Sequence, residues 1–176
     1  GEAVKIEVKG LQGGHSGMDI HKGFGNSNKI LSRFLLLDIQ NSDIQLINID
    51  SGGLRNAIPR EGITIFKVKD TQHFVNLAKE LRTEILDEFS SLERDLSIYI
   101  SKISTEENII NNENSIKIIH ALNIAHNGVF RMSPEVEGLV EASNNIARVE
   151  LKNGVFQVLN LTRSSVESSK MQVANQ

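Results

Sequence analysis

Apolar and polar residues alternate in four segments of the first hundred positions, and two amphipathic stretches lie between them. Alternation is typical of half-buried strands. The four alternating segments are residues 4–9, 44–50, 62–69 and 96–103. Apolar residues at helical spacing predict a helix over 26–37, capped by Asn26 or Ser27. The same spacing predicts a longer helix that is capped by Thr71 and runs to Phe89. The resulting order predicts an α+β fold, a two-layer sandwich with a ferredoxin-like βαββαβ core.

The second part of the chain is less regular and predicts additions to that core. A polar, Asn-rich stretch over 105–113 is expected to be a loop, followed by a helix over 115–125 that Asn127-Gly128 ends. Two apolar runs, 139–151 and 155–162, flank Asn153-Gly154, a strong hairpin signal. Ser164 or Ser165 is expected to cap a last helix that stops at Gln176, which suggests an excised piece. We therefore expect an additional helix and a β-hairpin beside the core.

Composition excludes several classes of partner. The chain of 176 residues has a formal net charge of -3, with both signs interspersed, so it offers no basic surface for nucleic acid or an anionic membrane. The absence of cysteine excludes a disulfide scaffold and a thiolate metal site, and it fits a reducing compartment. No apolar run is long enough to span a bilayer. The expectation is a single cytoplasmic domain that binds neither nucleic acid nor membranes.

A glycine-rich loop with one imidazole, His15, follows the first predicted strand. Small residues at the end of a strand let a ligand approach the backbone closely. His15 has three interpretations: a structural histidine, a metal ligand together with Asp19 and His21, or a hydrogen-bond donor or proton carrier for a substrate. The metal interpretation is the weakest, because no helix or knuckle fixes the spacing of these residues and no fourth ligand is near.

Four segments, in order and spanning most of the chain, resemble the aminoacyl-histidine dipeptidases (Xaa-His dipeptidases, or peptidase D). They are GLQGGHSGMDIH at 10–21 with Gly25-Asn26 after it, GGLRNAIPRE at 52–61, LVEASNN at 139–145 and LTRSS at 161–165. The resemblance implies a dinuclear zinc exopeptidase with two domains, one that carries the metals and one that forms a lid and a homodimer. Each segment alone gives modest support for this resemblance, whereas the four segments in this order are specific to the family.

The metal-binding motifs that the resemblance implies are missing from this chain. It has no HxD motif, and its adjacent acids Glu106-Glu107 lie in a polar loop. Residues 1–176 are therefore expected to be the lid and dimerisation domain alone, with no metal ligand. The catalytic domain, with two zinc ions or similar divalent metals, would lie before residue 1 and after residue 176 of the parent. The isolated chain is predicted to be inactive.

The resemblance also implies roles for individual residues. His15 would reach the active site of the partner subunit and donate a hydrogen bond to the oxygen that becomes negative as water attacks the peptide carbonyl. Asn56 would bind the dipeptide substrate near the scissile bond, and Arg163 would bind its C-terminal carboxylate. Asp19 and His21 would support the His15 loop from behind, although capping or surface roles suit them equally. Asn56 can also be read as a turn residue before a proline, and Arg163 as a surface residue at a strand end.

Two other functions fit the residues. A small ferredoxin-like domain could be a non-catalytic amino-acid-binding or regulatory module, in which the glycine-rich loop holds the backbone of a ligand. The chain could also be a purely structural dimerisation piece. The position of His15 distinguishes the first alternative from the lid: a catalytic lid presents His15 at its surface, whereas a binding module encloses His15 in a pocket with Asn56 and Arg163.

Overall fold

The computed structural model describes residues 1–175, which form a main antiparallel sheet with helices against it. The strands of the main sheet are β1 (Glu2–Lys9), β3 (Gln45–Gly52), β5 (Gly62–Lys67), β6 (Ser97–Ser104), β7 (Gly128–Met132), β8 (Val140–Lys152) and β9 (Val155–Ser164). A second, two-stranded sheet consists of β2 (Gly14–His15) and β4 (Ala57–Ile58). The helices are the 3-10 turn η1 (Ile20–Lys22), α1 (Ser27–Leu36), α2 (Thr71–Glu88), α3 (Asn112–Ile124) and α4 (Glu167–Ala174).

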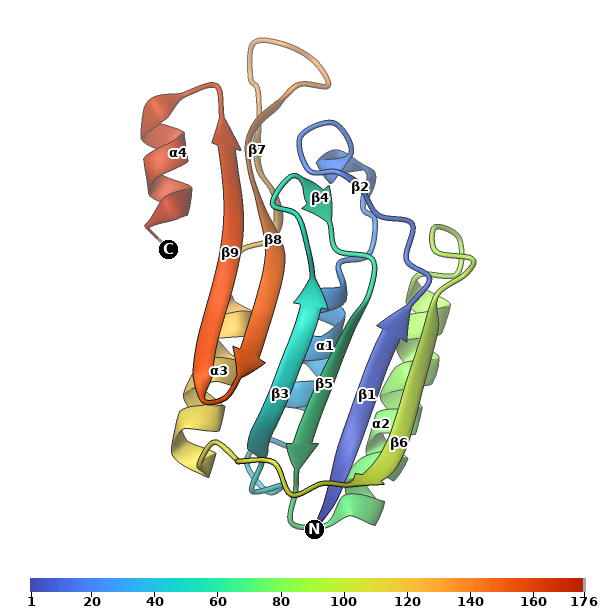
Figure 1. The fold of residues 1–176 in the computed structure, drawn as a ribbon. Coiled ribbons are helices and arrows are strands. Elements are labelled where there is room, and N and C mark those ends of the chain that lie inside the picture. Colours follow the sequence, from blue (N-terminus) through green and yellow to red (C-terminus); the bar gives the residue numbers. More distant parts are fainter. Residues whose placement is uncertain (176) are drawn as a thin grey trace.

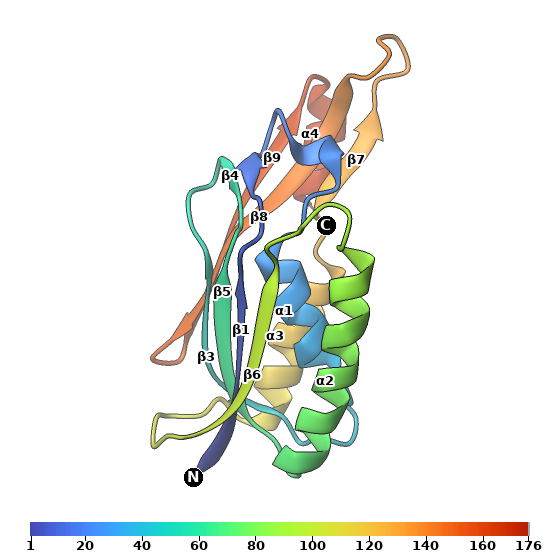
Figure 2. The same ribbon diagram turned by 90° about the vertical axis from the view of Figure 1, so that its right-hand side faces the viewer.

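The predicted ferredoxin-like core is confirmed. The strand order is β6-β1-β5-β3-β8-β7, with β9 paired to β8, and the first four strands of this order form the antiparallel βαββαβ sheet. Figure 2 shows α1, α2 and α3 on one face of the sheet, as a two-layer sandwich requires. The predicted extra helix and hairpin are α3 and β8–β9, and β8 extends the core sheet at the edge of β3.

Several predicted details are wrong because side chains compete for the same backbone groups. Asp70, and not Thr71, caps α2, since its carboxylate accepts from the His73 N–H at 2.9 Å. The last helix, α4, has Val166 before its first turn and no side-chain cap, because the Ser164 hydroxyl bonds to the backbone of Val166 instead.

The region after α3 also differs from its prediction. The helix begins at Asn112, inside the predicted loop, because the Asn111 side chain caps it. It ends at Ile124, and Gly128 starts strand β7, which the sequence pattern did not predict. The short strands β2 and β4 were missed as well, since two residues are too few to show an alternating pattern.

Apolar packing between the sheet and the helices holds the core. Val4, Ile6 and Val8 alternate along β1, and all three side chains are fully buried. Phe66 of β5 packs edge-on against Phe74 of α2, with the two ring centroids 5.1 Å apart. Burying one large apolar side chain contributes about 1.5–3 kcal/mol, so this layer supplies most of the stability of the domain.

At one end of the sheet, β8 separates from β3. The two strands pair from Leu151 to Arg148, and β8 then continues between β7 and β9. Beyond that point asparagine side chains make hydrogen bonds to the backbone of Ile146. Asn26 and Asn28 donate to its carbonyl at 3.1 and 2.9 Å, and Asn127 accepts from its N–H at 2.9 Å. Side-chain amides therefore replace strand pairing where the sheet divides. No helix within residues 1–175 is long and apolar enough to cross a membrane.

Candidate functional site

Three segments meet at the upper end of the sheet in Figure 1, and they carry His15, Asn56 and Arg163. The loop of residues 10–17 leaves β1 and contains β2, and the turn of residues 53–56 connects β3 to β4. Because His15 pairs with Ala57 in the small sheet, the loop and the turn lie side by side. Arg163 comes from the end of β9.

Asp19 fixes the backbone of the His15 loop. Its Oδ2 accepts from the His15 N–H at 2.7 Å, and its own N–H donates to the His15 carbonyl at 2.8 Å. Lys22 Nζ donates to Asp19 Oδ1 at 2.6 Å, and this bond, together with the His15 N–H, lowers the pKa of Asp19 from its ordinary value of 3.8. The carboxylate is therefore ionised at neutral pH and holds the loop closed.

The His15 side chain is held through one ring nitrogen only. Nδ1 accepts from the backbone N–H groups of Gly17 and Met18, both at 3.2 Å. Backbone N–H groups can only donate, so Nδ1 carries no proton and the neutral imidazole carries its proton on Nε2. Among the described residues Nε2–H has no hydrogen-bond partner, and the side chain is half-buried. The loop therefore presents one oriented, unused N–H donor.

Glycines allow this loop to fold and bring Arg163 to His15. Gly14 has a φ of +147°, and a Cβ there would lie 2.8 Å from Asp19 Oδ2. A Cβ on Gly17 would lie 3.2 Å from both His15 Cε1 and the guanidinium carbon of Arg163. The position of this absent Cβ is close to both groups, so the imidazole and the guanidinium flank Gly17. Any side chain at this position would displace one of them.

Asn56 lies at the tip of its turn with an exposed side chain. The turn is closed by the Ala57 N–H, which donates to the Leu54 carbonyl at 3.0 Å, and the Asn56 carbonyl accepts from the Ser16 N–H at 2.8 Å. The backbone of Asn56 is therefore joined to the residue next to His15, while its side-chain amide makes no hydrogen bond within residues 1–175. The structure thus brings the three predicted residues His15, Asn56 and Arg163 to one end of the domain.

Comparison with known proteins then decides the family. A family model for the peptidase dimerisation domain matches residues 6–95. The chain belongs to this family. It is 34% identical over 174 residues, 96% of its length, to the cytosol non-specific dipeptidase of Escherichia coli (strain K12), of which it covers 35%. It superposes on the crystal structure of aminoacylhistidine dipeptidase from Vibrio alginolyticus with a TM-score of 0.93 at 35% identity, covering 98% of this chain and 36% of that one. The chain thus spans about a third of the length of these relatives.

An open hollow lies beside Arg163 in this peptidase dimerisation domain. Its volume is about 620 Å³, and its lining includes Gly17, Thr162, Arg163 and Lys170 but neither His15 nor Asn56. Among residues 1–175 the Arg163 guanidinium has no hydrogen bond or ion pair, whereas Arg33, Arg131 and Arg148 each pair with carboxylates. Arg163 is therefore a cation available to an anionic group from outside the domain.

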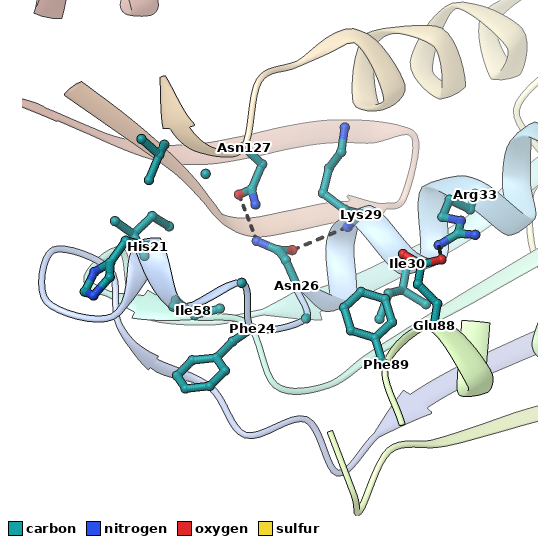
Figure 3. Close-up of a pocket in the computed structure, with 15 residues that line it drawn as sticks. His21, Phe24, Asn26, Lys29, Ile30, Arg33, Ile58, Glu88, Phe89 and Asn127 are labelled. Atoms are coloured by element: carbon teal, nitrogen blue, oxygen red, sulfur yellow. Dashed lines mark hydrogen bonds and ion pairs between the residues drawn. The ribbon is translucent and has the colours of Figure 1, made fainter. Parts of the chain in front are cut away.

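His21 lies apart from this arrangement. It is exposed on η1 and lines a second hollow of about 430 Å³ on the helical side, shown in Figure 3 with Phe24, Asn26 and Lys29. The hydrogen bonds that hold the His15 backbone within the described chain come from Asp19, so the loop is supported by one of the two predicted residues and not by the other. No three His, Asp or Glu side chains of residues 1–175 are placed to hold a metal ion.

Two buried residues that the sequence analysis did not single out hold this end of the domain in place. Glu93 is 4% exposed and accepts from the Gln12 N–H and the Gly25 N–H, both at 2.7 Å, so it joins the His15 loop to the segment between η1 and α1. Asn145 of β8 is 1% exposed and donates to backbone carbonyls of the Asn56 turn. An adjacent pair of asparagines, Asn144-Asn145, within a predicted strand is the signal for Asn145, whereas Glu93 sits in a charged segment that looks like an ordinary surface turn.

Proposed function

We propose that this chain is the lid and dimerisation domain of a cytosolic zinc metallodipeptidase that hydrolyses Xaa-His and related dipeptides. The names of both relatives, each a dipeptidase, support this activity, and the family supports a homodimer. Because the chain spans about a third of each relative, we place the catalytic domain before residue 1 and after residue 176 of the parent.

Zinc belongs to that flanking domain in this proposal. Residues 1–175 bring together no side chains that fit a metal ion, so no step of the reaction is assigned to a metal held by this chain. The contribution of this chain is to bind the dipeptide and to stabilise charge. The isolated chain is therefore expected to hydrolyse no dipeptide and to bind no zinc tightly.

The observation that carries the proposal is the free Nε2–H of His15. An N–H donor whose tautomer and direction are already fixed stabilises a developing oxyanion without reorganisation, and one such donor is worth about 10²–10³ in kcat. Two backbone N–H groups on Nδ1 provide this fixation. We assign Nε2–H to the oxygen of the scissile carbonyl in the active site of the partner subunit.

Arg163 and Asn56 bind the substrate in this account. The unpaired guanidinium of Arg163 suits the C-terminal carboxylate of a dipeptide, because its planar fork donates two parallel hydrogen bonds. The exposed amide of Asn56 can contact the peptide group near the scissile bond. Both residues lie at the end of the domain that carries His15, and the hollow beside Arg163 is open rather than enclosed around His15. This placement favours a lid over a module with a closed pocket of its own.

The test is turnover of a Xaa-His dipeptide by the full-length enzyme with His15→Ala. The proposal expects kcat to fall by about 10²–10³, with zinc content and dimer mass unchanged. The matched control is His120→Ala, since His120 is an exposed histidine on α3, away from the site. Turnover that matches the control variant would exclude His15 as the donor and leave the domain a scaffold.

A further inference from the structure

Asn145 connects strand β8 to the turn that carries Asn56. Its Nδ2 donates to the carbonyl of Arg55 at 3.1 Å and to the carbonyl of Ala57 at 2.8 Å. These two carbonyls flank Asn56 on either side, and the carbonyl of Asn56 itself accepts from the Ser16 N–H at 2.8 Å. Every backbone carbonyl from Arg55 to Ala57 is therefore fixed by a group outside the turn.

The position of Asn145 explains why a side chain is needed there. The last backbone bond between β8 and this segment is the one that the Gly53 N–H donates to the Ala147 carbonyl at 3.0 Å, so at Asn145 the backbone of β8 makes no hydrogen bond to residues 55–57. The amide of Asn145 spans this gap and supplies the two hydrogen bonds that a paired strand would otherwise supply. The side chain is 1% exposed, so water does not replace it.

The Asn145 side chain makes two hydrogen bonds as a donor and none as an acceptor, which indicates a positioning role more than a stabilising one. Its Oδ1 is buried and has no partner among the described residues. A buried acceptor without a partner lowers stability, and this loss offsets much of what the two donated bonds contribute. The amide orientation is fixed, because a flipped amide would place its oxygen against two carbonyl oxygens.

We propose that Asn145 is a positioning residue. It sets the Asn56 turn and, through the hydrogen bond that the Ser16 N–H donates to the Asn56 carbonyl, the position of His15. This inference rests on the proposed function, because Asn145 acts only through Asn56 and His15. It predicts that the loss of the amide displaces Asn56 and His15 together, although Asn145 makes no hydrogen bond to either of their side chains.

The experiment compares Asn145→Ala with Asn28→Ala in the full-length dimeric enzyme. Asn28 is the matched control, since its buried amide also donates from Nδ2 to a backbone carbonyl, that of Ile146, but does not hold the turn. We expect kcat/KM for a Xaa-His dipeptide to fall by about tenfold to a hundredfold with Asn145→Ala, as a displacement of about 1 Å produces. Asn28→Ala should lower the melting temperature by a similar amount with a much smaller loss of kcat/KM.

A double-mutant cycle provides the readout that a purely structural role would not change. In an Asn56→Ala background, Asn145→Ala should cost less activity than in the wild type, because its effect through the Asn56 side chain is gone and only its effect on His15, through the backbone carbonyl of residue 56, is left. If Asn145→Ala does not yield folded dimer, Asn145→Asp is used instead, because aspartate has nearly the same shape as asparagine. Its new carboxyl cannot donate when ionised but can donate once when protonated, so its activity relative to the wild type should rise as the pH falls.

Three results separate the two claims. Additive effects of Asn145→Ala and Asn56→Ala would overturn the positioning role, as would equal activity losses for Asn145→Ala and Asn28→Ala. If Asn56→Ala and His15→Ala themselves leave turnover intact, the proposed function fails instead.

Discussion

Different interactions stabilise the two ends of this domain. Around Phe66 and Phe74, sheet and helices meet through fully buried apolar side chains that pack on one another in large numbers. Around His15 and Asn56, the same sheet ends in loops whose shape depends on a few buried polar groups, of which Glu93 and Asn145 are the main ones. Apolar packing is spread over many contacts and tolerates small changes, whereas a clamp of two hydrogen bonds has no substitute. The lesson is that the core determines whether the domain folds, and the polar clamps determine where its candidate site lies.

The largest effect is expected in the core. Phe66→Ala should lower the free energy of unfolding by about 3–5 kcal/mol, because it removes a fully buried ring and leaves a cavity beside Phe74. Chemical denaturation measures this loss, and activity per folded molecule should change little. Val155→Ala, at an exposed position, is the control and should stay within about 0.5 kcal/mol. A similar loss for both variants would contradict the assignment of stability to this layer.

The next effect should appear in activity and not in stability. Arg163→Lys keeps the charge but loses the planar fork, so kcat/KM for a dipeptide should fall about tenfold to a hundredfold in the full-length enzyme. The unfolding curve should not move, since the Arg163 side chain makes no hydrogen bond or ion pair within residues 1–175 and the exchange leaves the backbone pairing of β9 intact. Arg94→Lys, at another exposed arginine, controls for general effects of the exchange. Unchanged kinetics for Arg163→Lys would remove Arg163 from the substrate site.

Glu93→Gln tests the hydrogen bonds by which Glu93 joins the His15 loop to Gly25. Each oxygen of Glu93 accepts one backbone N–H, so a glutamine places an NH₂ group against an N–H and leaves that donor without a partner. We expect the free energy of unfolding to fall by about 1–3 kcal/mol, and backbone hydrogen exchange at Gln12 and Gly25 to become faster. Glu113→Gln changes an exposed carboxylate on α3 and should have no measurable effect on either quantity. Protection at Gln12 and Gly25 that survives Glu93→Gln would show that the clamp is dispensable.

The smallest effect concerns pH. The pKa of Asp19 is lowered by Lys22 and by the His15 N–H, so its stabilisation of the loop is complete above the ordinary value of 3.8 and is lost as the pH falls through the lower folded value. Hydrogen exchange at His15, corrected for intrinsic rates, should therefore be constant from about pH 5 to 8 and rise only in stronger acid. Asp19→Asn should change this pH dependence of hydrogen exchange at His15, since the amide does not titrate. A loop that opens between pH 5 and 8 would contradict the role of Asp19.

The same contrast explains what the sequence could predict. Alternation and helical spacing report burial directly, so the ferredoxin-like core, the extra helix and the β8–β9 hairpin follow from pattern alone. The glycine-rich loop marked His15, and the resemblance to dipeptidases led to Asn56 and Arg163. The bonds from Asn145 and Glu93 join residues about 70 to 90 positions apart, and no local pattern encodes such a contact. Strand β7 (Gly128–Met132) was missed because its five residues do not alternate between buried and exposed positions.

The central claim is that His15 serves the active site of the partner subunit, and hybrid dimers of the full-length enzyme test it most directly. One subunit carries His15→Ala, and the other carries an intact His15 with a catalytic domain that has lost its metal ligands. Neither homodimer should turn over a Xaa-His dipeptide at more than a small fraction of the wild-type rate. The account predicts that mixing restores activity, because the hybrid contains one active site with both its metals and an intact His15 from the other subunit. Hybrids that form, as mass measurement confirms, and remain as inactive as the parents would contradict it.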